Sequence, residues 1–64
     1  MKFTVHAIRQ MRRRGIARCR VEIALLRGRE FWRRGALLVM HQRLRVVYCP
    51  YTDYVITAWW RGKK

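Results

Sequence analysis

Residues 36–60 read ALLVMHQRLRVVYCPYTDYVITAWW, and this stretch decides the fold. Apolar residues alternate along it with the period of a half-buried β-strand, and its last part is rich in β-branched and aromatic residues. Gln42 and Arg43 separate the first two apolar runs and are typical of a hairpin connection. Residues 50–53 include a proline and an aspartate and indicate a second turn. The stretch therefore predicts three consecutive antiparallel strands, over residues 36–41, 44–49 and 54–60.

A fourth strand is predicted just before these three. Residues 29–33 contain Phe31 and Trp32, and Gly35 turns the chain toward the next strand. The alternation also predicts which side chains share a face. It places Leu37 and Val39 on the side opposite to Leu38 and Met40, and it gathers Leu44, Val46 and Tyr48 on one face.

The first part of the chain follows a helical period instead. Val5, Ile8 and Met11 fall at three-residue steps, which is typical of the apolar stripe of a helix. Gly15 is suited to end that helix, because glycine adopts a positive φ without strain. The pattern predicts a helix over residues 5–14.

A second helix is predicted over residues 17–27, and Gly28 ends it. Its start is weakly specified, because the position near Ala17 offers no capping side chain. The order of elements predicts a single α+β domain over residues 1–64, with two N-terminal helices packed on a four-stranded antiparallel sheet. The expected apolar stripe of the second helix comprises Cys19, Ile23 and Leu26, with Val21, Ala24 and Leu25 beside it.

The charge of the chain predicts a polyanionic partner. Sixteen Lys and Arg residues stand against three acids, so the formal net charge is +13. Thirteen of the cations are arginines, whose planar guanidinium binds phosphate through two hydrogen bonds and stacks on bases. Nucleic acid is the first partner class, and an acidic protein is compatible with it. The alternatives are a basic surface that only confers solubility and a cationic peptide that disrupts membranes.

The composition argues against several other classes of protein. The longest apolar run, residues 36–40, is far shorter than a membrane span, and no apolar leader is present, so a cytoplasmic location is expected. Three acids are too few for a two-metal nuclease or a paired-carboxylate hydrolase. No metal or cofactor is expected, because the spacings of the four candidate ligands do not fit a metal site. Those ligands are His6, Cys19, His41 and Cys49.

Two motifs resemble a known family. Residues 6–16 read HAIRQMRRRGI, Gly35 follows, and residues 44–48 and 54–59 read LRVVY and YVITAW before Arg61. Together, from about residue 3 to residue 61, they look like a small bacterial domain family of formally unknown function that is related to the BrnT and RelE toxins. That resemblance implies the barnase/EndoU/colicin/RelE-like nuclease fold and a metal-independent ribonuclease, the toxin of a toxin–antitoxin pair with an acidic antitoxin.

The resemblance also implies a set of site residues. The family's helical His, Arg/Gln and Arg correspond to His6, Gln10 and Arg14, and its strand Thr corresponds to Thr57. This chain departs from the family at residues 17–20, which read ARCR where acidic residues are common, and it has the neutral Gln at position 10.

Metal-free cleavage of RNA needs a general base, a general acid and cations near the phosphate. Only His6 and His41 titrate near neutrality in their ordinary state. Spacings of four and eight place His6, Gln10 and Arg14 on one helix face. We therefore hypothesise that His6 is the general acid or base, that Arg14 holds the phosphate, and that Gln10 and Thr57 orient the substrate.

Each of these residues also has a structural reading. A histidine at a helix start is often a capping residue, and Arg14 is placed to complement the helix C-terminus. Thr57 is an ordinary strand residue, and Gln10 an ordinary surface residue. The competing function is a non-catalytic basic module that binds nucleic acid or an acidic protein.

Further residues are expected to contact RNA or a partner chain. Adjacent Trp59 and Trp60 point to opposite faces of a strand, so one is expected in the core and the other is available for base stacking or an interface. A chain of this length buries only about 60% of its unfolded surface, which favours a homodimer or an obligate partner. The expected RNA contacts are Arg9, Arg13, Arg45, Trp59 and Arg61.

Overall fold

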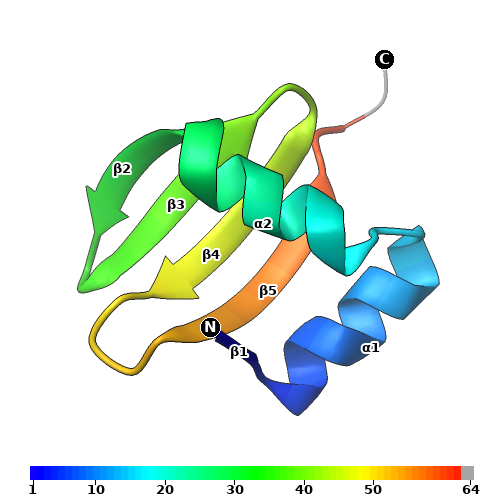
Figure 1. Ribbon diagram of the computed structural model, residues 1–64, viewed down its shortest axis with the longest axis horizontal. Coiled ribbons are helices and arrows are strands. Elements are labelled where there is room, and N and C mark those ends of the chain that lie inside the picture. Colours follow the sequence, from blue (N-terminus) through cyan, green and yellow to red (C-terminus); the bar gives the residue numbers. More distant parts are fainter. Residues whose placement is uncertain (63–64) are drawn as a thin grey trace.

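A computed structural model describes residues 1–62, which form two helices and five strands (Figure 1). An α+β fold is therefore confirmed. The bounds of the predicted elements agree with the structure to within one residue. The elements are β1 (Lys2–Phe3), α1 (Val5–Arg14), α2 (Arg18–Arg27), β2 (Arg29–Arg33), β3 (Ala36–His41), β4 (Leu44–Cys49) and β5 (Tyr54–Trp60).

The sheet has the strand order β1-β5-β4-β3-β2, and its neighbours from β2 to β5 are antiparallel. The predicted four-stranded antiparallel sheet is wrong in one respect, because β1 adds a fifth strand parallel to β5. Two residues are too few to show a period-two pattern. Backbone hydrogen bonds from Lys2 to Asp53 (2.8 Å) and from Thr4 to Val55 (3.1 Å) hold this segment against β5. The partner strand thus specifies β1.

Helix α1 is capped at both ends by its own sequence. The Thr4 side chain accepts a hydrogen bond from the backbone N–H of Ala7 (3.0 Å), and Gly15 ends the helix at φ 66°. Ala7 and Met11 are buried, whereas Val5 and Ile8 are 68% and 42% exposed. The predicted stripe Val5–Ile8–Met11 is therefore wrong except for Met11, because the four-residue step from Ala7 to Met11 faces the sheet.

Helix α2 buries the residues predicted to lie beside its apolar stripe and leaves the stripe itself exposed. Val21 and Ala24 are fully buried, while Leu26 is 84% exposed. Ile23 and Cys19 are exposed too, so Cys19 is not a core residue. The short side chains of Val21 and Ala24 let the helix approach β3 and β4 closely, whereas a larger stripe would hold it away.

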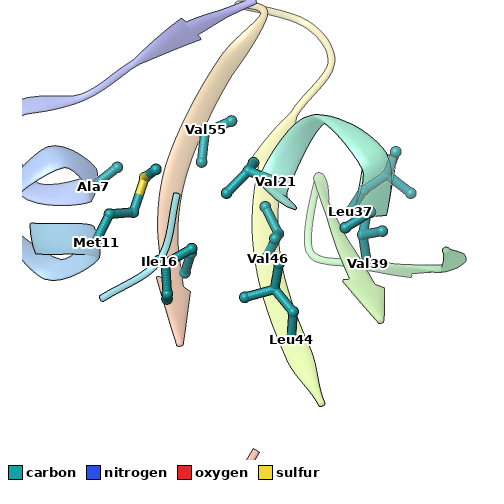
Figure 2. Close-up of a cluster of buried hydrophobic side chains, with 11 residues drawn as sticks. Ala7, Met11, Ile16, Val21, Leu37, Val39, Leu44, Val46 and Val55 are labelled. Carbon is teal, nitrogen blue, oxygen red and sulfur yellow. The ribbon is translucent and has the colours of Figure 1, made fainter. Parts of the chain in front are cut away.

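Helix α2 lies across one face of the sheet and α1 lies along its β5 edge (Figure 1), and a single core joins both helices to the sheet. Figure 2 shows side chains from the two helices and the sheet meeting there. The predicted inward face of β4 is confirmed for Leu44 and Val46, and Tyr48 packs at its margin. The core comprises Ala7, Met11, Ile16, Val21, Ala24, Leu37, Val39, Leu44, Val46, Val55 and Ala58.

The outer edge of β5 is covered by the chain around α1. Beyond the short β1, the Thr4 hydroxyl donates to the carbonyl of Ile56 (3.1 Å). The guanidinium of Arg14 donates to the carbonyl of Ala58 (2.9 Å). Unpaired strand edges invite association with another chain, and these bonds protect this edge. Edge β2 is different, because all five of its residues are exposed.

Candidate nucleic-acid interface

The solvent side of α1 is a continuous basic surface. At 100° per residue, His6, Arg9, Arg12 and Arg13 occupy the arc opposite to the buried Ala7 and Met11. All four are exposed. We call these four residues the α1 basic face. Arg12 and Arg13 also lie in the last turn, where positive charge complements the helix dipole.

Little negative charge compensates this surface. Two ion pairs are present in residues 1–62, between the Met1 amino group and Asp53 (3.0 Å) and between Arg18 and Glu22 (3.4 Å). None of the arginines of the α1 basic face takes part in either pair. The attraction of exposed cations for a polyanion is not offset when no carboxylate lies next to them. The positive charge of the α1 basic face is therefore not neutralised by ion pairs within residues 1–62.

Asp53 is the centre of the polar contacts at the start of β5. Its carboxylate accepts a hydrogen bond from the Tyr48 hydroxyl and pairs with the Met1 amino group. The Tyr48 hydroxyl and then the amino group hold the pKa of Asp53 below its ordinary value. The same hydrogen bond raises the pKa of Tyr48. These contacts join the N-terminus to the β4–β5 turn.

The lowered pKa of Asp53 predicts how stability depends on acid. A carboxyl group with a folded pKa below its unfolded value of about 3.9 contributes stability above that value, and this stability is lost as the pH falls through the folded pKa. Below about pH 4, the thermal midpoint of the natural chain should therefore fall more steeply with decreasing pH than that of Asp53→Asn. Thermal unfolding measured at successive pH values checks this. Equal acid dependence of the two chains would contradict it.

The four predicted catalytic residues occupy different surroundings. His6 is exposed on the α1 basic face, and Gln10 is half-buried. The buried Oε1 atom of Gln10 has no hydrogen-bond partner among residues 1–62. Arg14 uses one guanidinium nitrogen on the Ala58 carbonyl, and its own carbonyl accepts the Trp60 indole N–H (2.7 Å). Arg14 thus joins α1 to β5, and phosphate binding by its remaining donors stays a prediction.

Thr57 lies on the other side of the sheet. Its neighbour Ala58 is fully buried in the core, so Thr57 projects from the opposite face, where it is paired with Val47. Arg14 therefore reaches the backbone of the strand that carries Thr57, whereas the Thr57 side chain projects from the sheet face away from the core.

The sheet side away from the helices, which we call the open face, carries several predicted RNA contacts. Arg45 and Trp59 are direct neighbours across β4 and β5, and both are half-buried. The Nη1 atom of Arg45 donates hydrogen bonds to the backbone carbonyls of Gln42 and Leu44, both at 3.0 Å. These bonds hold the guanidinium near the β3–β4 turn. Two cross-strand rows follow from the register, Phe31–Leu38–Val47–Thr57 and Arg29–Met40–Arg45–Trp59.

The remaining predicted contacts lie at the ends of these surfaces. Arg9 and Arg13 belong to the α1 basic face, and Arg61 follows β5 with its backbone N–H bonded to the carbonyl of Arg43 (2.6 Å). The prediction that Trp59 and Trp60 face opposite sides is confirmed. The prediction that one of them enters the core is wrong, because Trp60 is 36% exposed and Trp59 half-buried. Trp60 instead lies at the margin of the core, where its indole N–H donates to the carbonyl of Arg14.

Sequence analysis missed a hollow at the end of the sheet. It has a volume of about 380 Å³ and is lined by Arg20, Gln42, Arg43 and Trp60. These residues are scattered along the sequence, and the pairing of Leu44 with Trp60 and the hydrogen bond from Arg61 to Arg43 bring the β3–β4 turn beside the end of β5. Pairing β4 with β5 residue by residue from the turn at residues 50–53 would have indicated from the sequence that the β3–β4 turn lies near Trp60.

No protein-family model, curated protein or solved structure matches the chain. Within residues 1–62, neither helix has the length and apolar character needed to cross a bilayer. In the same part of the chain, no three His, Cys, Asp or Glu side chains gather as metal ligands. The functional conclusion therefore depends on the chain's own residues.

Proposed function

We propose that this protein binds RNA, with the α1 basic face as the principal phosphate-binding surface. The observation that carries the proposal is the set of exposed arginines on one side of α1, none of which pairs with an acid in residues 1–62. Arginine grips phosphate with a planar pair of donors, and release of the counterions of RNA drives such binding. A net charge of +13 strengthens the attraction at longer range.

An acidic protein is the second partner class for the same surface. An antitoxin that covers the α1 basic face with carboxylates would compete directly with RNA. The exposed edge strand β2 and the exposed side chains of Leu26 (84%) and Trp32 (60%) offer a separate apolar area for that partner or for a second copy of the chain.

Cleavage of RNA is the second candidate function. The motif resemblance to BrnT and RelE toxins supports a RelE-like fold and a toxin-like, metal-independent endoribonuclease. The position of His6 supports it too, because an exposed imidazole lies on the helix side that carries Arg9 and Arg13. A general acid or base beside phosphate-binding cations is what the reaction needs.

Purified protein and a labelled single-stranded RNA test both functions in one experiment. We expect both the natural chain and His6→Ala to retard the RNA on a native gel, because Arg9, Arg12 and Arg13 remain in the variant. On a denaturing gel, the natural chain should fragment the RNA and His6→Ala should do so at least about a hundredfold more slowly, the usual contribution of a general acid or base. The same pair of chains expressed in a bacterial host should show growth arrest for the natural chain alone.

The outcomes separate the two functions. Retardation of RNA that stays intact would mean that the protein binds RNA and does not cleave it. Equal fragmentation by both chains would remove His6 from the reaction. No retardation by either chain would overturn the proposal of RNA binding.

A further inference from the structure

The hollow at the end of the sheet combines an aromatic ring with cations and an amide. Trp60 comes from the end of β5, Gln42 and Arg43 form the β3–β4 turn, and Arg20 comes from α2. The turn and the end of β5 lie side by side in Figure 1, as the pairing of Leu44 with Trp60 requires. A volume of about 380 Å³ falls in the range of small-molecule sites.

The ring of Trp60 is held in place before any ligand binds. Its indole N–H donates to the carbonyl of Arg14 (2.7 Å), and the guanidinium of Arg20 lies 5.8 Å from its ring centroid. Trp60 keeps 36% of its surface exposed. A fixed, partly exposed ring beside a guanidinium provides flat groups on which a base can stack.

The charges around the hollow select for an anion. Two of its four lining residues are arginines, and no acid is among them. Neither Arg20 nor Arg43 belongs to the ion pairs found in residues 1–62. A nucleotide has a flat base and a phosphate linked to it, which is the combination that an indole and two guanidinium groups bind together.

Gln42 adds a group that can recognise a base edge. Its φ is 56°, a left-handed conformation that Gly or Asn adopts with less strain in a hairpin turn. The turn therefore carries an amide side chain at a position where glycine would be more stable. An amide both donates and accepts, as the edge of an unpaired base requires.

We propose that this hollow binds one unpaired nucleotide of a single-stranded RNA, with the base on Trp60 and the phosphate between Arg20 and Arg43. The proposal rests on the proposed function, since it assigns a base-binding site to the same RNA. Base-paired RNA cannot present a free base to the ring, so the hollow gives the protein a preference for single strands.

Dissociation constants for a single-stranded RNA and for a duplex with the same number of phosphates test this inference. The natural chain should bind the single strand more tightly. Trp60→Leu should weaken single-strand binding about fivefold or more and leave duplex binding unchanged, because stacking on one ring is lost. The matched control is Trp32→Leu, which removes an exposed indole outside the hollow and should change neither constant.

Gln42→Gly keeps the test valid if Trp60→Leu disturbs the fold. Glycine suits the positive φ, so this variant should unfold no more easily than the natural chain and should still lose part of the single-strand preference. Circular dichroism checks the fold of each variant.

Equal binding of single strands and duplexes by the natural chain would overturn the site. So would a second pair of results, in which Trp60→Leu weakens the binding of both RNAs and Gln42→Gly weakens the binding of neither. Both results would leave RNA binding itself intact. If the natural chain bound neither RNA at low salt, the proposed function would fail as well.

Discussion

Gly28→Ala should strongly destabilise the fold. An added Cβ would lie 2.5 Å from the carbonyl oxygen of Ala24, 2.7 Å from that of Met40 and 2.8 Å from Cγ1 of Val39. Two of these atoms belong to the backbone, so α2 and β3 would have to separate. Overpacking of this kind costs about 3 kcal/mol or more. A domain of this length has a total stability of only about 3–10 kcal/mol, so about a third of it or more would be lost.

Urea unfolding followed by circular dichroism measures this effect. Gly62→Ala is the matched control, because an added Cβ there meets nothing within 4 Å. We expect the control to keep the natural midpoint and Gly28→Ala to unfold at a much lower urea concentration or in buffer alone. Similar midpoints for the two variants would show that the α2–β3 contact is looser than the structure has it.

Replacing Arg9, Arg12 and Arg13 together by Gln should weaken RNA binding about a hundredfold at low salt. The estimate takes about 1 kcal/mol for each lost contact between a guanidinium and a phosphate. The slope of log Kd against log salt should fall by about 2, because each contact with a single strand contributes about 0.7. Fluorescence anisotropy of a labelled RNA at several salt concentrations gives both values.

A second triple variant separates local contacts from net charge. Replacing Arg27, Arg33 and Arg34 by Gln removes the same charge near β2, the strand at the opposite end of the sheet from α1 (Figure 1). This control should weaken binding far less. Equal losses in the two variants would mean that RNA responds to total charge rather than to the α1 basic face. Circular dichroism must accompany both, since Arg12 and Arg13 also stabilise the end of α1 by about 0.3–1 kcal/mol each.

The sequence predicted the four long strands and both helices because each has a strong local signal. Alternation marks β3 and β4, and Gly15 and Gly28 mark the helix ends. β1 escaped prediction because its hydrogen bonds to Asp53 and Val55 come from a strand about fifty residues later. Such a short segment has no pattern of its own.

The buried sides of the helices were harder to predict than the helices themselves. Residue size favoured Ile8 in α1 and Ile23 in α2, yet the smaller Ala7 and Ala24 face the sheet. Close helix–sheet packing needs small residues at the contact, and this requirement appears only when the two layers are placed together. The large apolar residues were left partly exposed as a result.

The candidate site shows the same limit. The basic stripe of α1 follows from helical spacing alone, so Arg9 and Arg13 were found in the sequence. The hydrogen bond from Arg14 to Ala58 and the hollow around Trp60 depend on contacts between distant segments. Helical spacing grouped Arg14 with His6, but the edge of β5 determines where its guanidinium lies.

The salt dependence of RNA binding by the natural chain tests the central claim most directly. We expect binding of a single-stranded RNA at about 50 mM salt, with a slope of log Kd against log salt of about 3 or more, which corresponds to at least about four phosphate contacts. Binding that hardly changes with salt, or no binding at that concentration, would contradict the claim that the arginines of this protein hold RNA through its phosphates.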